Sequence, residues 1–175
     1  VMQIQFKKLT IPTPEIANTL NNWENDPSLI PFIRPNATKE ALESREAVTQ
    51  DSLLKRLEYN QIYLIYLDEN LIGEVSFQID PQHLYREVSG SAWIGINIGE
   101  ASARGKGVGT QTMRFLEEEI TERGLKRIEL GVFEFNENAI KLYKKMGYKE
   151  IGRIENFTYW EGKMWTDIRM EKYLK

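Results

Sequence analysis

The spacing of apolar and polar residues changes several times along the chain, and these changes predict its elements. Residues 3–9 alternate as a β-strand does, and two prolines then end the strand and permit a helix from about Glu15. Ile16, Leu20 and Trp23 recur at helical spacing in that segment. The chain therefore begins with a strand and an amphipathic helix.

A second helical pattern follows a proline-containing loop. Thr38 has the character of an N-cap residue, with acidic residues in the turn after it. We expect one helix from there to about Tyr59, with Leu53, Leu54 and Leu57 facing the core.

Residues 61–80 predict a β-hairpin with its turn at Asp68-Glu69-Asn70. In the second strand of this hairpin, alternation assigns the side chains to two faces. One face holds Leu71, Gly73, Val75, Phe77 and Ile79, and the other holds Ile72, Glu74, Ser76 and Gln78. Most of the polar side chains thus share one face.

A strand over residues 88–98 leads into a glycine-rich turn and a helix that starts near Gly109. Met113, Leu116 and Ile120 face inward in this helix, Glu117, Glu118 and Glu122 face outward, and Gly124 ends it in the left-handed conformation. A buried strand over residues 127–133 follows. A strand, a helix and a strand in this order predict a right-handed crossover between parallel strands.

The last part of the chain predicts one more helix and a hairpin. Residues 136–146 place Ala139, Leu142, Tyr143 and Met146 on one stripe, and Gly147 follows. Strands over 148–157 and 163–173 flank a turn at Glu161-Gly162.

The glycine-rich turn has the features of a phosphate-binding site. Its glycines allow the backbone to approach a ligand closely, and the helix behind them presents unpaired N–H groups. It is not a P-loop, because five residues separate Gly99 from Gly105-Lys106 and Gly107 replaces the required hydroxyl. It is not a Rossmann fingerprint, because its third glycine is out of register. We expect a side chain at Gly107 or Gly109 to block a phosphate without unfolding the domain.

Composition narrows the class of protein. A chain of 175 residues suits a single domain, and a net charge of −3 argues against a nucleic-acid partner. With no cysteine and one histidine, we expect no disulfide and no metal site. The chain has no long apolar segment and no secretory leader pattern, so we expect a cytoplasmic protein without a membrane contact. Val1 ahead of Met2 suggests an added residue, and we set it aside.

Two local motifs resemble those of the GCN5-related N-acetyltransferase (GNAT) superfamily. Arg104-x-x-Gly107-x-Gly109 resembles motif A, and residues 136–148, from Asn136-x-x-Ala139 to Gly147-Tyr148, resemble motif B. The ending GKMWTDIRMEKYL is similar to the branch that includes ribosomal-protein and polyamine acetyltransferases. The resemblance implies an α+β fold over residues 1–175, with a mixed central sheet of six to seven strands and helices on both faces.

The resemblance also implies acetyl-CoA as co-substrate and an amine as acceptor. The strand before motif A is expected to diverge from its neighbour, so that its backbone binds the pantetheine and the acetyl group. The residues implied to bind acetyl-CoA are Ile96, Asn97, Ile98, Arg104, Gly105, Lys106, Gly107, Val108, Gly109, Thr110, Asn136, Ala139 and Tyr143.

Transfer of an acetyl group to an amine needs a proton acceptor and a donor to the departing thiolate. By resemblance Tyr143 is the acid. The position of the glutamate that some family members use as a base is Gly131 here. Glu74 and Glu129 are the alternatives, and we rank Glu74 slightly higher.

The acceptor region is expected to favour a small cationic amine or a peptide N-terminus, because it combines carboxylates with aromatic rings. The residues assigned to it are Trp23, Glu24, Asp26, Phe32, Glu74, Glu155, Tyr159, Trp160 and Glu161. Trp160 and Trp165 on the last hairpin could support a homodimer. A non-catalytic acyl-CoA binding or regulatory module is the alternative function.

Overall fold

A computed structural model describes residues 2–175, so Val1 lies outside the described residues. The elements are β1 (Ile4–Lys8), α1 (Pro14–Glu24), α2 (Ile30–Ile33), α3 (Lys39–Glu43), α4 (Gln50–Arg56), β2 (Gln61–Leu67), β3 (Asn70–Ile79), β4 (Ser91–Ile98), η1 (Ala101–Ala103), α5 (Val108–Glu122), β5 (Arg127–Phe133), α6 (Glu137–Lys145), β6 (Lys149–Trp160) and β7 (Lys163–Tyr173).

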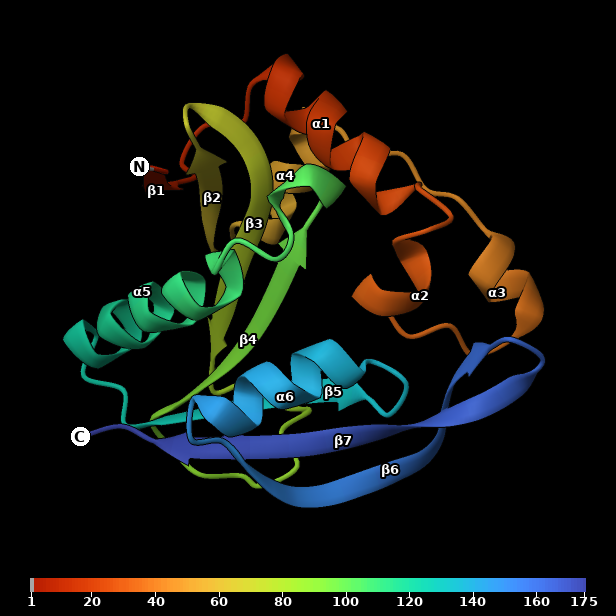
Figure 1. Cartoon of the computed structure of the whole chain (residues 1–175), viewed down its shortest axis with the longest axis vertical. Coiled ribbons are helices and arrows are strands. Elements are labelled where there is room, and N and C mark those ends of the chain that lie inside the picture. Colours follow the sequence, from red (N-terminus) through yellow and green to blue (C-terminus); the bar gives the residue numbers. More distant parts are fainter. Residues whose placement is uncertain (1) are drawn as a thin grey trace.

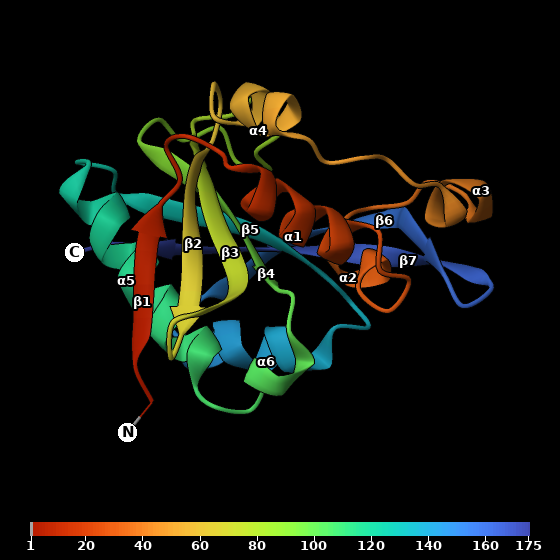
Figure 2. The same ribbon diagram turned by 90° about the horizontal axis from the view of Figure 1, so that it is seen from above.

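The strands form one mixed sheet of seven in the order β1-β2-β3-β4-β5-β7-β6. All neighbouring pairs are antiparallel except β4 and β5, which are parallel, as the crossover predicted. Helices α5 and α6 cover one face of the sheet, and α1 and α4 lie on the other (Figures 1 and 2). The predicted α+β fold, with a mixed sheet and helices on both faces, is confirmed.

Two apolar cores hold the layers together. The larger core packs Met113, Leu116 and Ile120 of α5 against the sheet, and the apolar stripe of α6 packs beside them. The smaller core packs Leu20 and Trp23 of α1 against α4 and β2. The inward residues predicted for α5 and α6 are therefore confirmed. Glu117 is an exception on the expected outer face, because it accepts a hydrogen bond from Tyr148 and pairs with Lys172.

The single helix expected from Thr38 to Tyr59 is wrong. The chain forms α3 and α4 with an extended segment between them, and Leu54 is 49% exposed. Side chains of α1 and its C-cap bind this segment. The C-cap residue Asn25 bonds the backbone N–H and C=O of Glu46, and Asn21 accepts a hydrogen bond from the N–H of Val48. Because these bonds replace helical ones, α4 starts anew with a capping box at Thr49.

The face assignment of β3 is wrong at its start. The register with β2 shifts between Ile65 and Tyr66, which is a β-bulge. Ile72 consequently packs in the larger core with Val75 and Phe77, whereas Leu71 packs against the smaller core. From Glu74 onward the predicted polar face holds.

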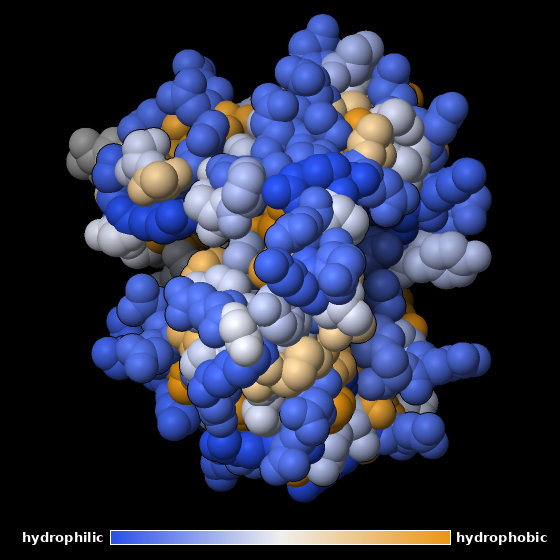
Figure 3. Space-filling view, turned by 90° about the vertical axis from the view of Figure 1, so that its right-hand side faces the viewer, coloured by the Kyte–Doolittle hydropathy of each residue, from blue (hydrophilic) through white to orange (hydrophobic). Residues whose placement is uncertain are grey.

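The surface seen from the side of α2, α3 and the β6–β7 hairpin is mostly hydrophilic, with small separate apolar patches (Figure 3). None of the helices within residues 2–175 combines the length and apolar character needed to cross a bilayer.

Candidate active site

The sheet opens between its two parallel strands. Strand β4 pairs with β5 only from Ser91 to Trp93, which lies opposite Glu129, whereas β5 continues beside β7 to Phe133. The edge of β4 that faces β5 is therefore free of strand pairing over residues 94–98, and it lies between the two halves of the sheet (Figure 1). The divergence implied by the family resemblance is present, and it exposes the backbone of Ile96, Asn97 and Ile98.

Glu74 lies beside this opened edge. The β3–β4 register places Glu74 directly opposite Asn97. Both side chains line a cavity of about 500 Å³ whose walls come from α1, the segment 46–48 and α4. This volume is within the usual range of small-molecule sites, about 300–1,000 Å³. The cavity joins the polar face of β3 to the free edge of β4.

Glu74 has a strongly perturbed carboxyl group. Burial and, to a lesser extent, the nearby carboxylate of Glu24 raise its pKa to about 7, against the opposing effect of Arg56. Its Oε2 is buried and has no hydrogen-bond partner among the described residues. A carboxyl group with a pKa near neutrality can accept and release a proton at physiological pH.

The glycine-rich turn and the start of α5 have the geometry of a phosphate site. Gly105 and Gly107 have φ angles of +73° and +74°, and a Cβ at either position would meet no atom within 4 Å. No side chain caps α5, so the N–H groups of its first residues, Val108, Gly109 and Thr110, are free for a ligand. Arg104 and Lys106 are exposed beside them. These observations fit the pyrophosphate site that motif A implies.

Gly109, in the first turn of α5, lies against α6. A Cβ there would lie 2.9 Å from Leu142 Cδ2, which is the far end of a flexible side chain, so a small side chain at this position needs only a shift of Leu142. The expectation that a side chain at Gly107 or Gly109 blocks a phosphate without unfolding the domain stays a prediction.

Helix α6 places its three predicted site residues beside the opening. Asn136 is the N-cap, and its Oδ1 accepts a hydrogen bond from the N–H of Ala139. Ala139 and Tyr143 pack against the larger core. Burial raises the pKa of Tyr143 to about 12, so the phenol is fully protonated at neutral pH. Its ring packs edge-on against Tyr148.

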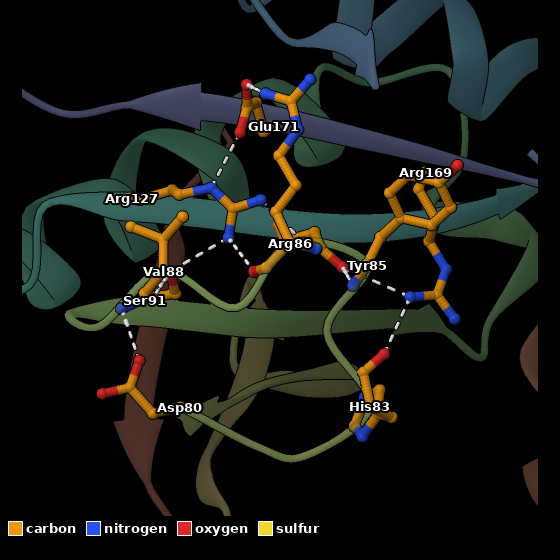
Figure 4. A network of polar contacts seen from close by, with 10 residues as sticks. Asp80, His83, Tyr85, Arg86, Val88, Ser91, Arg127, Arg169 and Glu171 are labelled. Atoms are coloured by element: carbon orange, nitrogen blue, oxygen red, sulfur yellow. Dashed lines mark hydrogen bonds and ion pairs between the residues drawn. The ribbon is translucent and has the colours of Figure 1, made fainter. Parts of the chain in front are cut away.

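Glu129, the alternative base, belongs to an internal ionic network and is not available as a base. It pairs with Arg127 and Arg169 and accepts hydrogen bonds from the N–H groups of Tyr85 and Arg86. Burial opposes ionisation, but these partners together hold the pKa of Glu129 below its usual range. Figure 4 shows how this network joins the loop after β3 to β5 and β7.

The space beside Gly131 is filled by side chains of the neighbouring strands β4 and β7. A Cβ at Gly131 would lie 2.7 Å from Asp167 Oδ2 and 3.0 Å from the ring of Trp93. A glutamate at this position would have no room. Asp167 is itself paired with Arg169, and burial raises its pKa.

The residues expected to bind the acceptor are only partly brought together. Trp23 is 4% exposed and lies under Gly99, so it supports the strand end and offers no face to a substrate. Glu24 lines the cavity, but Arg56 binds it with two hydrogen bonds of 2.6 and 2.7 Å. Tyr159 bonds through its N–H to Asn36 and does not line this cavity. Asp26, Glu155 and Glu161 do not line it either.

Two arginines of the cavity were missed by the sequence analysis. Arg56 follows an ordinary helical pattern, and Arg34 lies in a loop between prolines, so neither has a motif around it. Their role appears only when α1, α2 and α4 come together over β3 and β4. Within residues 2–175, no group of three or more His, Asp or Glu side chains is arranged to hold a metal ion.

Known proteins resemble this chain in sequence and in fold. The profile of the Acetyltransferase (GNAT) family matches residues 19–148. A spermine/spermidine N(1)-acetyltransferase of Bacillus subtilis is 26% identical over 115 residues, which cover 65% of this chain and 74% of that protein. An uncharacterised N-acetyltransferase of Bacillus subtilis is 32% identical over 114 residues, with coverages of 63% and 69%.

Two solved structures share the whole architecture. The spermidine N-acetyltransferase of Vibrio cholerae, in complex with CoA and spermine, superposes with a TM-score of 0.74 at 19% identity and covers 98% of this chain and 95% of its own. The ribosomal-protein-alanine N-acetyltransferase of Brucella melitensis gives 0.75 at 19% identity, with coverages of 97% and 99%. The family profile spans most of the chain and includes both motifs, the opened strand and Glu74. The chain therefore belongs to the GNAT family and is an acetyl-CoA dependent N-acetyltransferase.

Proposed function

We propose that the enzyme transfers the acetyl group directly to a primary amine held in the cavity, with Glu74 as the proton acceptor. The observation that carries this proposal is the position of Glu74, opposite Asn97 on the opened strand, with a buried and unpartnered Oε2. A buried carboxylate oxygen without a partner is costly, and an ammonium group in the cavity would satisfy it.

Glu74 removes a proton from the ammonium, and the free amine attacks the acetyl carbonyl carbon. Backbone N–H groups of β4 polarise the carbonyl, and the C–S bond breaks after the C–N bond has formed, with its electron pair leaving on sulfur. The second proton that the nitrogen loses passes to this thiolate, so that the products are the amide and free CoA thiol. Bound acetyl-CoA supplies the thioester. Tyr143 stabilises the thiolate by donating a hydrogen bond, because full proton transfer from a phenol of pKa about 12 to a thiolate is unfavourable.

We assign the pyrophosphate to the N–H groups at the start of α5, with Arg104 and Lys106 supplying charge. Gly105 and Gly107 allow the approach, and Ile96, Asn97 and Ile98 offer backbone groups to the pantetheine. Asn136, Ala139 and Tyr143 border the same opening from α6. The unfilled space over the two glycines and the uncapped helix support this assignment.

Thiol release from acetyl-CoA in the presence of a panel of primary amines tests the proposal. We expect release that depends on the amine, with one acetyl group gained by the product in mass spectra. Calorimetric binding of acetyl-CoA without release for any amine would instead support the alternative, a non-catalytic acyl-CoA binding module.

Three expectations from the sequence stay predictions: a cytoplasmic location, no nucleic-acid partner, and a homodimer through the last hairpin. The hairpin carries Trp160 and Trp165, which are partly exposed and pack against the ring of Phe135. Cell fractionation, a DNA-binding assay and sedimentation of the purified protein test them.

A further inference from the structure

Acidic and basic side chains nearly balance in the cavity, whereas a site for a polycation needs an excess of negative charge. Five charged residues line it: Glu24, Arg34, Glu46, Arg56 and Glu74. Glu24 and Arg56 neutralise each other in a two-bond ion pair. Glu46 is exposed at the rim. The two charged side chains that remain are the carboxyl group of Glu74 and the cationic guanidinium of Arg34.

Arg34 is fixed in place but has no anionic partner. Its Nη2 donates to the carbonyl oxygens of Ala41 and Ser44, at 3.3 and 2.9 Å. Its Nε is buried and without a hydrogen-bond partner, and no ion pair within residues 2–175 involves it. A guanidinium with an unpaired, buried N–H is a group that a carboxylate would stabilise.

The loop that carries Arg34 is itself held rigidly. Asn36 accepts a backbone hydrogen bond from Tyr159 and donates its own N–H to Thr158, so the loop is joined to β6. A guanidinium on a fixed loop is preorganised, because little conformational freedom remains to be lost when an anion binds. The position of Arg34 is thus suited to recognition.

The same cavity is therefore lined by a carboxyl group and a guanidinium that form no ion pair among the described residues. Glu74 comes from β3, and Arg34 comes from the loop after α2. Ile33, Val48 and Ile96 supply apolar surface between the polar groups. A ligand that satisfies both ends needs an ammonium group, an oxyanion and a modest apolar part.

We propose that the acceptor is a zwitterionic small molecule of the amino-acid class, with its amine at Glu74 and its carboxylate at Arg34. This proposal rests on the proposed function and specifies its substrate class. A polyamine would leave Arg34 unpaired and would place a positive charge near it. A carboxylate-bearing amine would pair both groups.

The test compares amino acids with their own amides. L-Leucine, L-methionine, β-alanine and 4-aminobutyrate are assayed for thiol release beside the four matching amides and spermidine. At least one acid should exceed its amide in kcat/KM by about tenfold or more, because loss of one charge-assisted hydrogen bond costs that factor. Spermidine should be a poorer substrate than that acid.

Variants locate the preference at Arg34. Arg34→Gln should raise the KM for the acid by about tenfold or more and leave that for the amide nearly unchanged. Arg34→Lys should restore part of the loss. Arg45→Gln is the matched control, since Arg45 is an exposed arginine that, like Arg34, donates to carbonyl oxygens at the end of α3, those of Leu42 and Ser44, and does not line the cavity. Thermal unfolding of each variant shows whether the loop is intact.

Distinct results overturn the two proposals. If amides or spermidine are acetylated but no acid is acetylated better than its amide, the zwitterion proposal is wrong and the acetyltransferase assignment stands. If spermidine is acetylated best and Arg34→Gln has no effect, the same conclusion holds. If no compound causes thiol release and acetyl-CoA gives no heat of binding, the proposed function itself is wrong.

Discussion

Glu74 has two charged neighbours of opposite sign, which act on its pKa in opposite directions. Burial and Glu24 favour the neutral acid, whereas Arg56 favours the carboxylate. Since the pKa is about 7, small changes of pH change the fraction of Glu74 that is ionised, and in its proposed role as the base this fraction sets the activity.

We expect kcat/KM to rise with pH through about 7, as Glu74 loses its proton. Glu74→Gln should lower kcat by about 10²- to 10⁴-fold and remove this rise. Steady-state kinetics between pH 5 and pH 9 measure both effects. Glu118→Gln, which changes an exposed carboxylate of α5, is the control. A variant at position 74 with the wild-type pH profile would contradict the assignment of the base.

Ionised Glu74 should lower the free energy of unfolding of the protein. Its pKa in the folded state is raised above its ordinary value of 4.5, so its favourable contribution is present below pH 4.5 and is lost as the pH rises through about 7. Glu74→Gln should therefore raise the Tm at pH 8 and leave it unchanged near pH 4. The gain in unfolding free energy at pH 8 is at most about 3 kcal/mol, from 1.36 kcal/mol per pKa unit. Equal Tm differences at both pH values would exclude this cause.

Tyr143 should affect the chemical step more than cofactor binding. Tyr143→Phe removes the hydroxyl and keeps the ring that packs against Tyr148. We expect kcat to fall by about tenfold or more, because one hydrogen bond to a developing charge is lost, while the KM for acetyl-CoA changes little. Single-turnover measurements separate this step from product release. An unchanged single-turnover rate would leave Tyr143 as a core aromatic only.

At the scale of the elements, helix α5 has a left-handed glycine at each end. Gly107 precedes its first residue and Gly124 follows its last turn, with φ angles of +74° and +78°, and a Cβ at either position would meet no atom within 4 Å. A substitution at either position would impose the same kind of backbone strain, but only Gly107 borders the predicted phosphate site.

Gly107→Ala and Gly124→Ala should lower the unfolding free energy by similar amounts, about 1–2 kcal/mol for a side chain at positive φ. Only Gly107→Ala should weaken acetyl-CoA binding, because its methyl group enters the space of the pyrophosphate. Calorimetry and thermal unfolding are the measurements. Equal loss of affinity in the two variants would mean that stability, and not access of the phosphate, explains the effect.

At the scale of the whole molecule, a buried ionic network joins the loop after β3 to the second half of the sheet. Arg127 donates to the carbonyl oxygen of Arg86, and Arg169 donates to that of His83 (Figure 4). Glu129 forms ion pairs with both arginines. Because β4 and β5 share only a short pairing, this network adds contacts between the halves where the sheet is weakest.

Glu129→Gln should destabilise the protein by about 3–5 kcal/mol, since it leaves two arginines in the interior without their shared carboxylate. The pKa of Glu129 is lowered in the folded state, so its stabilising effect is present above its unfolded pKa and is lost as the pH falls. Urea unfolding at pH 7 and pH 3.5 should show a smaller difference at the lower pH. Arg153→Gln, which breaks exposed ion pairs, should cost less than about 1 kcal/mol.

Sequence periodicity determined the elements that pack by a regular apolar stripe. The strands, α5 and α6 follow local rules, because residues three, four or two positions apart share a face whatever lies around them. The phosphate loop also follows from local sequence, since glycine conformations and a helix start need no distant partner. Because both family motifs lie within residues 91–148, these local features were sufficient to recognise the family.

Tertiary structure alone decided the cavity and its charges. The extended segment between α3 and α4 exists because Asn21 and Asn25 bind its backbone, and the bulge in β3 reverses the faces of Leu71 and Ile72. Glu24 pairs with Arg56, 32 positions away, so the carboxylate that the sequence analysis assigned to the acceptor is already neutralised. The same packing leaves Arg34 Nε without a hydrogen-bond partner. Such pairings depend on which surfaces meet, and no local pattern encodes that.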